Sequence, residues 1–523
     1  MEYDIVLLGS GISSTQTLLQ LLRQIDKNPL PAEKIKIAIV EKAGEFFTGI
    51  PYGSRSSVNS LTITTFGEFI HPNEKEAFLE WLESGKTAWL ENLSALGGQT
   101  AANWLQNNRL QFEQKKWDEI YIPRFLYGRF LTGQIQTALD KAGREEKALV
   151  SLIRAEAIDV SPAHGASYHI TLESESGETW VVHAKKLILA IGSGTIKPVP
   201  PPEANGTGPG EHYYINDTYH PSLASNLDTI GSLLEGIAEK QGRNLLIIGS
   251  NASSLELLYL INQRPALEKA INKIVVISFS GLLPHRITEN SHPDYHFERL
   301  EALKKQDSYS STDLIQIIEK DLDIAYAKGV HIGDMYYQLS DLVVELLKKL
   351  SPDQEKDFYS RYGNRFTKLI RRAGAEYRDA AQELIDSGKL ELLKGSFLSL
   401  KNPGAGKPGV LLEFRDTVEK KEQTFPLVFP IVINCGGFED LDASSSRLIN
   451  SLVSKNICKI NSTNRGFEVS EQFEANQNLY IMGPLLGGIF NKRVKYWHVE
   501  NAKRVHSLSV LLAEAIVESL NCP

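Results

Sequence analysis

The sequence predicts an α/β protein with two Rossmann-like domains and a helical insertion, and three observations predict this fold. Two segments, at about 3–41 and 244–277, each run from an apolar strand through a glycine turn and an amphipathic helix to a second apolar strand. Strands alternating with helices in this way form βαβ units in a parallel sheet. Each unit is followed by antiparallel-looking runs, at 167–191 and at 409–434. A charged amphipathic stretch at about 290–390 predicts the helical insertion.

The first unit carries a dinucleotide-binding pattern, Gly9-x-Gly11-x-x-Ser14. The first glycine permits a tight turn, the second lets the backbone approach a pyrophosphate, and the third position needs a small residue, which serine supplies. The phosphates would lie on backbone N–H groups at the helix N-terminus. The next strand ends on Glu41, whose carboxylate would accept hydrogen bonds from a ribose diol. The alternative is an ordinary glycine turn. The candidate cofactor residues of this unit are Gly9, Ser10, Gly11, Ser13, Ser14, Glu41 and Lys42.

The second unit departs from that pattern, since it reads Gly249-x-Asn251-x-x-Ser254. Asparagine stands where close approach of a phosphate usually requires glycine. The following strand ends Ser278-Phe279-Ser280, with no arginine to meet a 2′-phosphate. Two interpretations stay open: a working NAD(P)H site at Gly249, Asn251 and Ser254, or a purely structural domain.

Composition narrows the function classes. At roughly 150 residues per domain, 523 residues suggest two to four domains. The net charge of −8 is mild and argues against a nucleic-acid-binding protein. Three distant cysteines form no CxxC, which argues against a disulfide scaffold or a dithiol redox pair and favours a reducing compartment. We expect a cytoplasmic protein with no membrane partner, because there is no signal-like start and the apolar runs are only strand-length.

Several single residues invite a chemical role, but a structural one is the simpler interpretation. His292 and His296 have helical spacing without a third ligand, so no metal is expected. Cys435 is expected to be a small buried residue. His498 precedes the last apolar helix, where capping or packing is favoured over catalysis. Arg124 is a candidate contact for a cofactor phosphate or a carboxylate substrate.

A series of short motifs resembles the two-dinucleotide-domain flavoproteins called FAD/NAD(P)-binding proteins, which are related to class B flavin monooxygenases and amino-acid N-monooxygenases. The motifs follow the family's order along nearly the whole chain. After the Gly9 turn they are Gly49–Gly53 (like G-x-A-Y), Val58-Asn59 (like L-N), Pro123–Leu131 (like P-R-x-x-Y-G-x-Y-L), Leu189–Gly192 (like A-T-G), Gly281–Pro284 and Met482–Leu485. The chain departs from the family at Asn251 and in the insertion, where Arg361–Arg365 replaces an Arg/Trp/His-rich stretch.

The resemblance implies a glutathione-reductase-like fold with FAD in the first domain. That domain is expected to be discontinuous, from 1–205 and 440–523, with an NAD(P)H-binding-like domain at 206–439 that contains the insertion. It adds Asn59, Arg124, Gly192 and Gly483 as candidate cofactor residues.

The resemblance also implies an FAD-dependent, NAD(P)H-using monooxygenase, N-hydroxylating in some relatives, with a small amine or amino-acid-like substrate. Two alternatives remain: a flavoprotein oxidase or desaturase that inserts no oxygen, and a flavin-binding regulatory or assembly protein. The catalytic residues are not assigned, and a homo-oligomer is left open.

Overall fold

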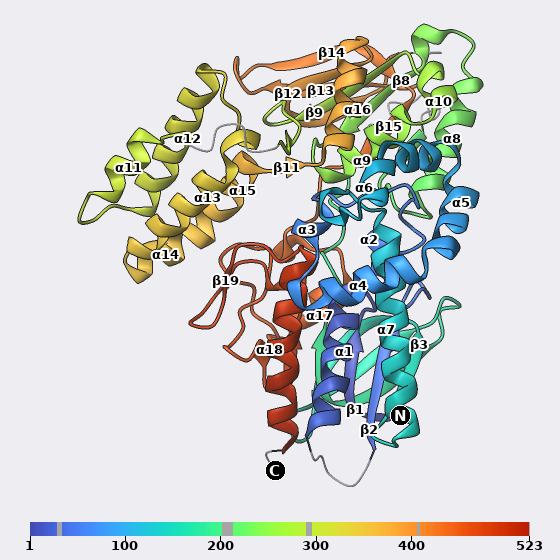
Figure 1. Ribbon diagram of the computed structural model, residues 1–523, viewed down its shortest axis with the longest axis vertical. Helices are drawn as coiled ribbons and strands as arrows, with labels where there is room; N and C mark the ends of the chain where they lie inside the picture. The colour runs from blue at the N-terminus through green and yellow to red at the C-terminus, as the bar shows by residue number, and fades with distance from the viewer. Residues whose placement is uncertain (29–33, 201–212, 289–294, 405–407, 522–523) are drawn as a thin grey trace.

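The computed structural model describes residues 1–28, 34–200, 213–288, 295–404 and 408–521. Two sheets, each with a parallel centre and an antiparallel extension, lie one above the other along the long axis of the molecule (Figure 1). Helices cover both. This confirms the predicted α/β fold with two Rossmann-like domains.

The first sheet forms the lower body in Figure 1. Its strands are β1 (Glu2–Leu8), β2 (Ile35–Glu41), β3 (Ala148–Arg154), β4 (Glu156–Ala163), β5 (Ser167–Glu173), β6 (Thr179–Leu189), β16 (Glu474–Asn476) and β17 (Leu479–Ile481). They follow the order β16-β17-β6-β1-β2-β3, and β4 and β5 extend it from β6. The centre of β1 is apolar on both sides because helices cover the sheet. Those helices are α1 (Ile12–Lys27), α7 (Arg124–Arg144), α17 (Arg447–Ser454) and α18 (Ala502–Asn521).

The end of the chain returns to the first sheet, because β17 pairs in parallel with β6, with Leu479 opposite Leu187 and Ile481 opposite Leu189. This pairing supports a discontinuous first domain. The domain boundaries at 205, 206, 439 and 440 stay a prediction.

The second sheet forms the upper body. Its strands are β7 (Tyr213–Ile215), β8 (Asn244–Ile248), β9 (Lys273–Ser278), β12 (Leu390–Lys401), β13 (Val410–Asp416), β14 (Glu422–Phe429) and β15 (Ile431–Asn434), and its helices are α8 (Leu223–Glu235), α9 (Ala252–Asn262), α10 (Pro265–Ala270) and α16 (Ala375–Asp386). The strand order is β14-β13-β12-β9-β8-β15-β7. The apolar run expected at 427–434 is divided at Pro430: β14 is antiparallel to β13, whereas β15 is parallel to β8. Proline lacks the N–H that a continuous ladder needs.

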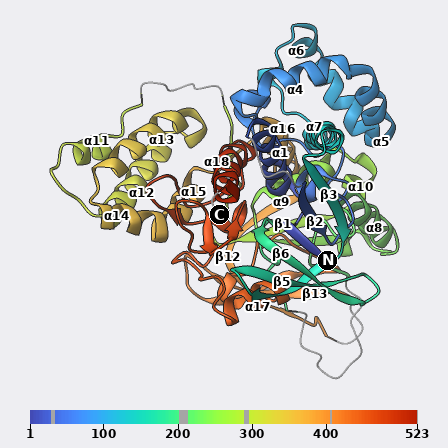
Figure 2. The same cartoon turned by 90° about the horizontal axis from the view of Figure 1, so that it is seen from below.

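Two further groups of helices lie outside the two sheets and the helices that cover them. The first, inserted between β2 and β3, comprises α2 (Gly49–Tyr52), α3 (Phe66–Phe69), α4 (Pro72–Ser84), α5 (Lys86–Asn107) and α6 (Arg109–Glu113). Trp89, Trp104 and Trp117 are buried in the apolar core there, and Trp81 is partly buried against it, so these side chains serve packing. Seen from below, α4 to α6 lie at the upper right and the second group lies at the left (Figure 2).

The second group is the predicted insertion, and it has its own apolar core. It comprises α11 (Glu298–Lys304), α12 (Ser311–Ala327), α13 (Ile332–Lys349), α14 (Pro352–Asp357) and α15 (Gly363–Ile370). It is shorter than the expected 290–390, because α16 packs on α9 and covers the second sheet. The short strands β10 (His285–Arg286) and β11 (Arg372–Ala373) pair in parallel where the chain enters and leaves it. In the described part of the chain, no helix combines the length and apolar character needed to cross a membrane.

Candidate functional site

Gly9 forms the turn that follows β1. Its φ is +93°, and a Cβ there would lie 2.5 Å from the carbonyl oxygen of Ala190, at the end of β6. The Gly9 amide donates a 2.8 Å hydrogen bond to the carbonyl of Val40 in β2. Glycine is required here because neighbouring backbone leaves no room for a side chain and because other residues rarely adopt this φ.

Gly11 is glycine for a different reason. It is the N-cap of α1, with an ordinary φ of −78° and no side-chain cap. A Cβ there would meet no described atom nearer than the Cα of Gly49, at 3.7 Å. Protein packing therefore does not demand glycine, whereas a ligand on the uncapped N–H groups of the helix would. The space that a side chain would fill fits the pyrophosphate of a dinucleotide.

Glu41 lies at the end of β2, beside this turn. One carboxylate oxygen accepts a hydrogen bond from the Ser10 amide and the other from the Ala43 amide, both at 2.9 Å. Each oxygen keeps a lone pair, so the carboxylate fits the predicted contact with a ribose diol. Lys42 is exposed, with its Nζ 3.8 Å from Glu156, and takes no part in the turn.

Gly483 brings the C-terminal part of the chain to the same place. It follows β17 with φ +84°, and a Cβ there would overlap the Ser13 hydroxyl in the first turn of α1. Gly192, after β6, has φ +82° and open space where a Cβ would lie. Ser14, at the third position of the pattern, is fully buried. The structure thus brings the predicted residues of the first unit together around the N-terminus of α1, with the exception of the Lys42 side chain.

The second turn repeats the backbone of the first. Gly249 has φ +103°, its amide donates to Ile277 of β9 at 2.8 Å, and a Cβ would overlap the carbonyl oxygen of Cys435. Asn251 is the N-cap of α9 with φ −87°, in the extended region that Gly11 also occupies. Its exposed side chain makes no capping hydrogen bond. The asparagine therefore leaves the backbone unchanged and places a side chain where the first turn has none.

The end of β9 differs from the end of β2. Ser278 accepts a hydrogen bond from the Gly281 amide at 3.1 Å, and Phe279 is 75% exposed. Arg286 is engaged elsewhere, by two hydrogen bonds of 2.7 and 2.9 Å to Asp379. The exposed Lys394 stands opposite Ser278 in the register of β12 and β9. Sequence reasoning missed this cation, because β12 lies more than a hundred residues further along the chain.

The side chains of Arg124 and Asn59 form hydrogen bonds with residues outside both glycine turns. The Nη2 of Arg124 donates to Glu256 at 2.5 Å and to Ser56 at 2.8 Å, and the two charged side chains are 12% and 3% exposed. Burial opposes the charge of Arg124, but the Glu256 carboxylate raises its pKa above the ordinary value. Asn59 donates to the Gly97 carbonyl of α5 at 3.0 Å. A role for either residue in cofactor binding stays a prediction.

Glu256 is a residue whose importance the sequence analysis missed. It also accepts hydrogen bonds from Ser60 and from Tyr219, the latter at 2.7 Å. It stands seven residues after Gly249, and Gln16 stands seven residues after Gly9. Gln16 is equally buried and donates to Tyr127 of α7 at 3.0 Å. A buried polar residue at the same register of both units was the available signal.

The single residues with doubtful roles lie as follows. Cys435 is buried, as expected, and burial raises the pKa of its thiol to about 12. His292 lies outside the described residues, and within them no group of three His, Cys, Asp or Glu side chains forms a metal site. Burial and the charges of Arg504 and Arg371 lower the pKa of His498 to about 4.

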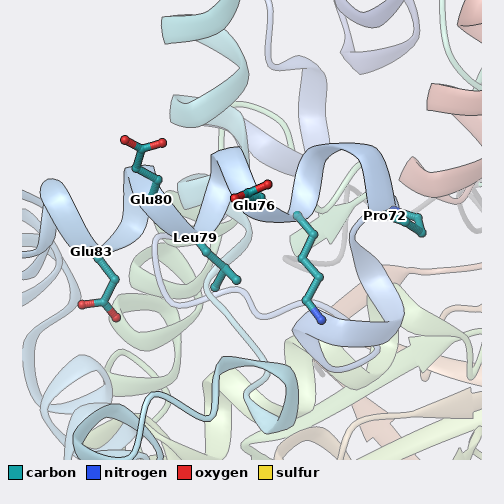
Figure 3. A pocket seen from close by; sticks show the side chains of 6 residues that line it. Pro72, Glu76, Leu79, Glu80 and Glu83 are labelled. Carbon is teal, nitrogen blue, oxygen red and sulfur yellow. The ribbon is translucent and has the colours of Figure 1, made fainter.

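An open hollow on the exposed face of α4 is lined by acidic side chains (Figure 3). Its lining residues are Pro72, Lys75, Glu76, Leu79, Glu80 and Glu83. It holds neither glycine turn. Two of its side chains are already engaged: Lys75 pairs with Asp118 at 2.7 Å, and Glu83 accepts from Trp117 at 2.6 Å. We therefore place the functional site at the glycine turns.

Comparison with known proteins agrees with this placement. Residues 6–194 match a family model described as FAD-NAD(P)-binding. Uncharacterized proteins of Mycobacterium tuberculosis and Mycobacterium bovis are each 37% identical to this chain, over 99% of it and 96% of their own length. The matched segment contains the first glycine turn, which confirms the prediction of a dinucleotide-binding domain.

Solved structures with the same fold are remote in sequence. An ornithine N-hydroxylase of Kutzneria sp. 744, with reduced FAD, NADP+ and L-ornithine, is 12% identical with a TM-score of 0.54 and covers 99% of both chains. The FAD-bound cadaverine monooxygenase of desferrioxamine biosynthesis from Erwinia amylovora is 10% identical with a TM-score of 0.52, over 100% of this chain and 95% of that one. These likenesses show the two-dinucleotide-domain fold.

Proposed function

The chain belongs to a family of FAD-NAD(P)-binding proteins that includes the mycobacterial relatives, and from this we propose that it is an FAD-dependent monooxygenase. It uses NAD(P)H and acts on a small amine or amino-acid-like substrate, with N-hydroxylation as the favoured reaction. The observation that carries the proposal is the first glycine turn, where an uncapped helix, the side-chain-free Gly11 and Glu41 form a site for FAD. The remote structures that share the fold are enzymes of this class.

The residues of the first unit would hold FAD. The N–H groups that begin α1 would bind the pyrophosphate, and Glu41 would accept from a ribose hydroxyl. When bound, FAD would supply the redox chemistry, which is acceptance of a hydride from NAD(P)H and reaction with O₂. Gly483, which lies against Ser13, would keep the C-terminal segment close to the cofactor without a side chain between them.

The second unit supports a pyridine-nucleotide partner, since its turn has the backbone of the first. Asn251 and the absence of an arginine at the end of β9 favour weak binding with little preference for NADPH. The same features favour the second candidate, a flavoprotein oxidase or desaturase that does not depend on NAD(P)H.

One experiment separates these candidates. The FAD-loaded protein is mixed anaerobically with NADPH or NADH, flavin bleaching is followed, and air is then admitted with and without candidate amines. Bleaching by a reduced coenzyme, followed by reoxidation that yields a hydroxylated amine, is expected of the monooxygenase. Bleaching by an amine alone would assign an oxidase or desaturase. If neither a reduced coenzyme nor an amine bleaches the flavin, the result would assign a regulatory or assembly role.

We further propose a cytoplasmic location, supported by the three widely separated cysteines. The oligomeric state stays open. Size-exclusion chromatography with light scattering would measure it directly.

A further inference from the structure

The first turn of α7 contacts both of the helices that follow the glycine turns. Arg124 is the first residue of α7, and Tyr127 stands three positions later. The Nη2 of Arg124 donates to Glu256 of α9 at 2.5 Å, and the Tyr127 hydroxyl accepts a hydrogen bond from Gln16 of α1 at 3.0 Å. Glu256 and Gln16 each stand seven residues after the first glycine of their own unit. One turn of α7 therefore holds the two helices at matching positions.

Close backbone contacts connect the same part of α7 to the first glycine turn. A Cβ at Gly128 would overlap the carbonyl oxygen of Tyr52, so the backbone of α7 lies directly against α2. At the start of α2, Gly49 has φ +62°, and a Cβ there would lie 2.9 Å from the Cα of Gly11. Neither position has room for a side chain. The segment Pro123–Leu131 thus supplies a contact to each of α9, α1 and α2.

The Glu256 carboxylate has donors on both oxygens. Oε1, which Arg124 contacts, also accepts a hydrogen bond from the Ser60 hydroxyl, and Oε2 accepts from the Tyr219 hydroxyl at 2.7 Å. The side chain of Glu256 is only 3% exposed. Apolar residues of similar volume often replace a buried ion pair without loss of stability, so stability alone does not account for the charges. A buried carboxylate with fixed donors instead defines one position of α9 relative to α7.

We propose that Arg124 and Glu256 are positioning residues, which fix the second glycine turn relative to the first and so set the approach of the reduced coenzyme to the flavin. This inference rests on the proposed function. The step concerned is transfer of a hydride, with its two electrons, from NAD(P)H to FAD, which yields NAD(P)+ and FADH⁻. A misplacement of about 1 Å can slow a reaction about 100-fold. Because the pair stands at neither N-cap, it should govern the rate of this step and not the affinity for either nucleotide.

The test uses the double variant Arg124→Met, Glu256→Leu, which removes both charges together and leaves neither unpaired, so the fold should be retained. Stopped-flow reduction of the FAD-loaded full chain, over a range of NADPH or NADH concentrations, separates the limiting rate from the coenzyme affinity. We expect the limiting rate to fall about 10- to 100-fold. FAD occupancy and the affinity for NADP+, measured by isothermal titration, should stay at the wild-type values. Hydrogen exchange of residues 56–61, measured without FAD, should rise because Ser60 loses its acceptor.

The matched control is the double variant Arg372→Met, Glu68→Leu. It removes another ion pair between distant parts of the chain, since Arg372 of β11 and Glu68 of α3 lie 2.8 Å apart, and the Arg372 side chain is equally buried. Neither residue lies in α7 or α9. We expect the control to keep the wild-type rate of flavin reduction and the wild-type hydrogen exchange of residues 56–61.

The proposal is overturned if the test variant folds and is reduced at the wild-type rate, or if the control is slowed equally. It is also overturned if NADP+ affinity falls together with the rate, because Arg124 would then contact the coenzyme. If the test variant does not fold, Tyr219→Phe takes its place, since it removes one donor and keeps the ion pair. A slower limiting rate is then expected, and an unchanged one overturns the proposal. If neither coenzyme bleaches the wild-type flavin, the proposed function fails, whereas hydrogen exchange still tests how Glu256 holds residues 56–61.

Discussion

The turns at Gly9 and Gly249 have the same backbone conformation and differ in the side chain at the helix N-cap that follows. In both, the glycine amide donates to the adjacent strand at 2.8 Å, and a Cβ would strike the carbonyl that ends another strand. Two residues later the N-cap has nearly the same φ, −78° at Gly11 and −87° at Asn251. The first N-cap is bare and the second carries an exposed amide side chain. The first glycine of the pattern therefore serves the fold, and we propose that the second serves the ligand.

The largest effect is expected from alanine at the first glycine of either turn. Gly9→Ala and Gly249→Ala combine a left-handed backbone, about 1–2 kcal/mol, with overpacking of about 1–3 kcal/mol, and the atom met is rigid backbone. We expect each to lower the free energy of unfolding by about 2–5 kcal/mol, measured by urea denaturation. Gly192→Ala has a similar positive φ but open space, so it should cost only about 1–2 kcal/mol. Equal losses in all three would show that strain, and not the close approach, matters.

The next effect concerns the buried residues that tie each turn's helix to α7. Glu256→Gln should destabilise the protein by about 3 kcal/mol, because it leaves the buried charge of Arg124 uncompensated. Glu422→Gln is the control, since Glu422 and Arg415 form an exposed pair worth about 0–1 kcal/mol. Urea denaturation of both variants measures the difference. If the Glu256→Gln protein is as stable as the control variant, the surroundings of Arg124 must rearrange to stabilise its charge without Glu256.

The backbone of the two units could be predicted from the sequence because it depends on local pattern. The apolar strands, the glycine that follows each first strand and the acidic end of β2 can each be recognised in a short contiguous stretch of sequence. The partners of Arg124 could not be predicted in the same way. Glu256 lies 132 positions further along the chain, and only the tertiary fold brings α9 to Arg124, the first residue of α7.

A third test isolates the ligand's requirement in the first turn. Gly11→Val should leave the fold intact, because its backbone is ordinary and a Cβ meets nothing nearer than 3.7 Å. The side chain would block the pyrophosphate, so FAD affinity should fall about 100-fold, or about 2.7 kcal/mol. Flavin absorbance per protein gives the occupancy, and circular dichroism checks the fold. Gly133→Val, at an exposed position of α7 with open space, should keep full occupancy. A folded Gly11→Val protein with full FAD would contradict the assignment of this turn.

The smallest effect is expected from the reverse change in the second turn. Asn251→Gly removes a side chain that makes no capping hydrogen bond and leaves a backbone that already matches that of Gly11. If the side chain holds a coenzyme pyrophosphate outward, its removal should tighten NADPH and NADH alike by about 3- to 10-fold, up to about 1.4 kcal/mol. Stopped-flow reduction of the flavin by each coenzyme measures this, with wild type and variant compared over a range of concentrations. Both coenzymes should gain equally, because the change acts at the pyrophosphate that they share. A gain confined to NADPH would instead point to the 2′-phosphate, and Lys394→Gln, beside Ser278 in the register of β12, would then abolish it. No change for either coenzyme would show that the pyrophosphate does not approach α9, and the second turn would then serve the fold alone.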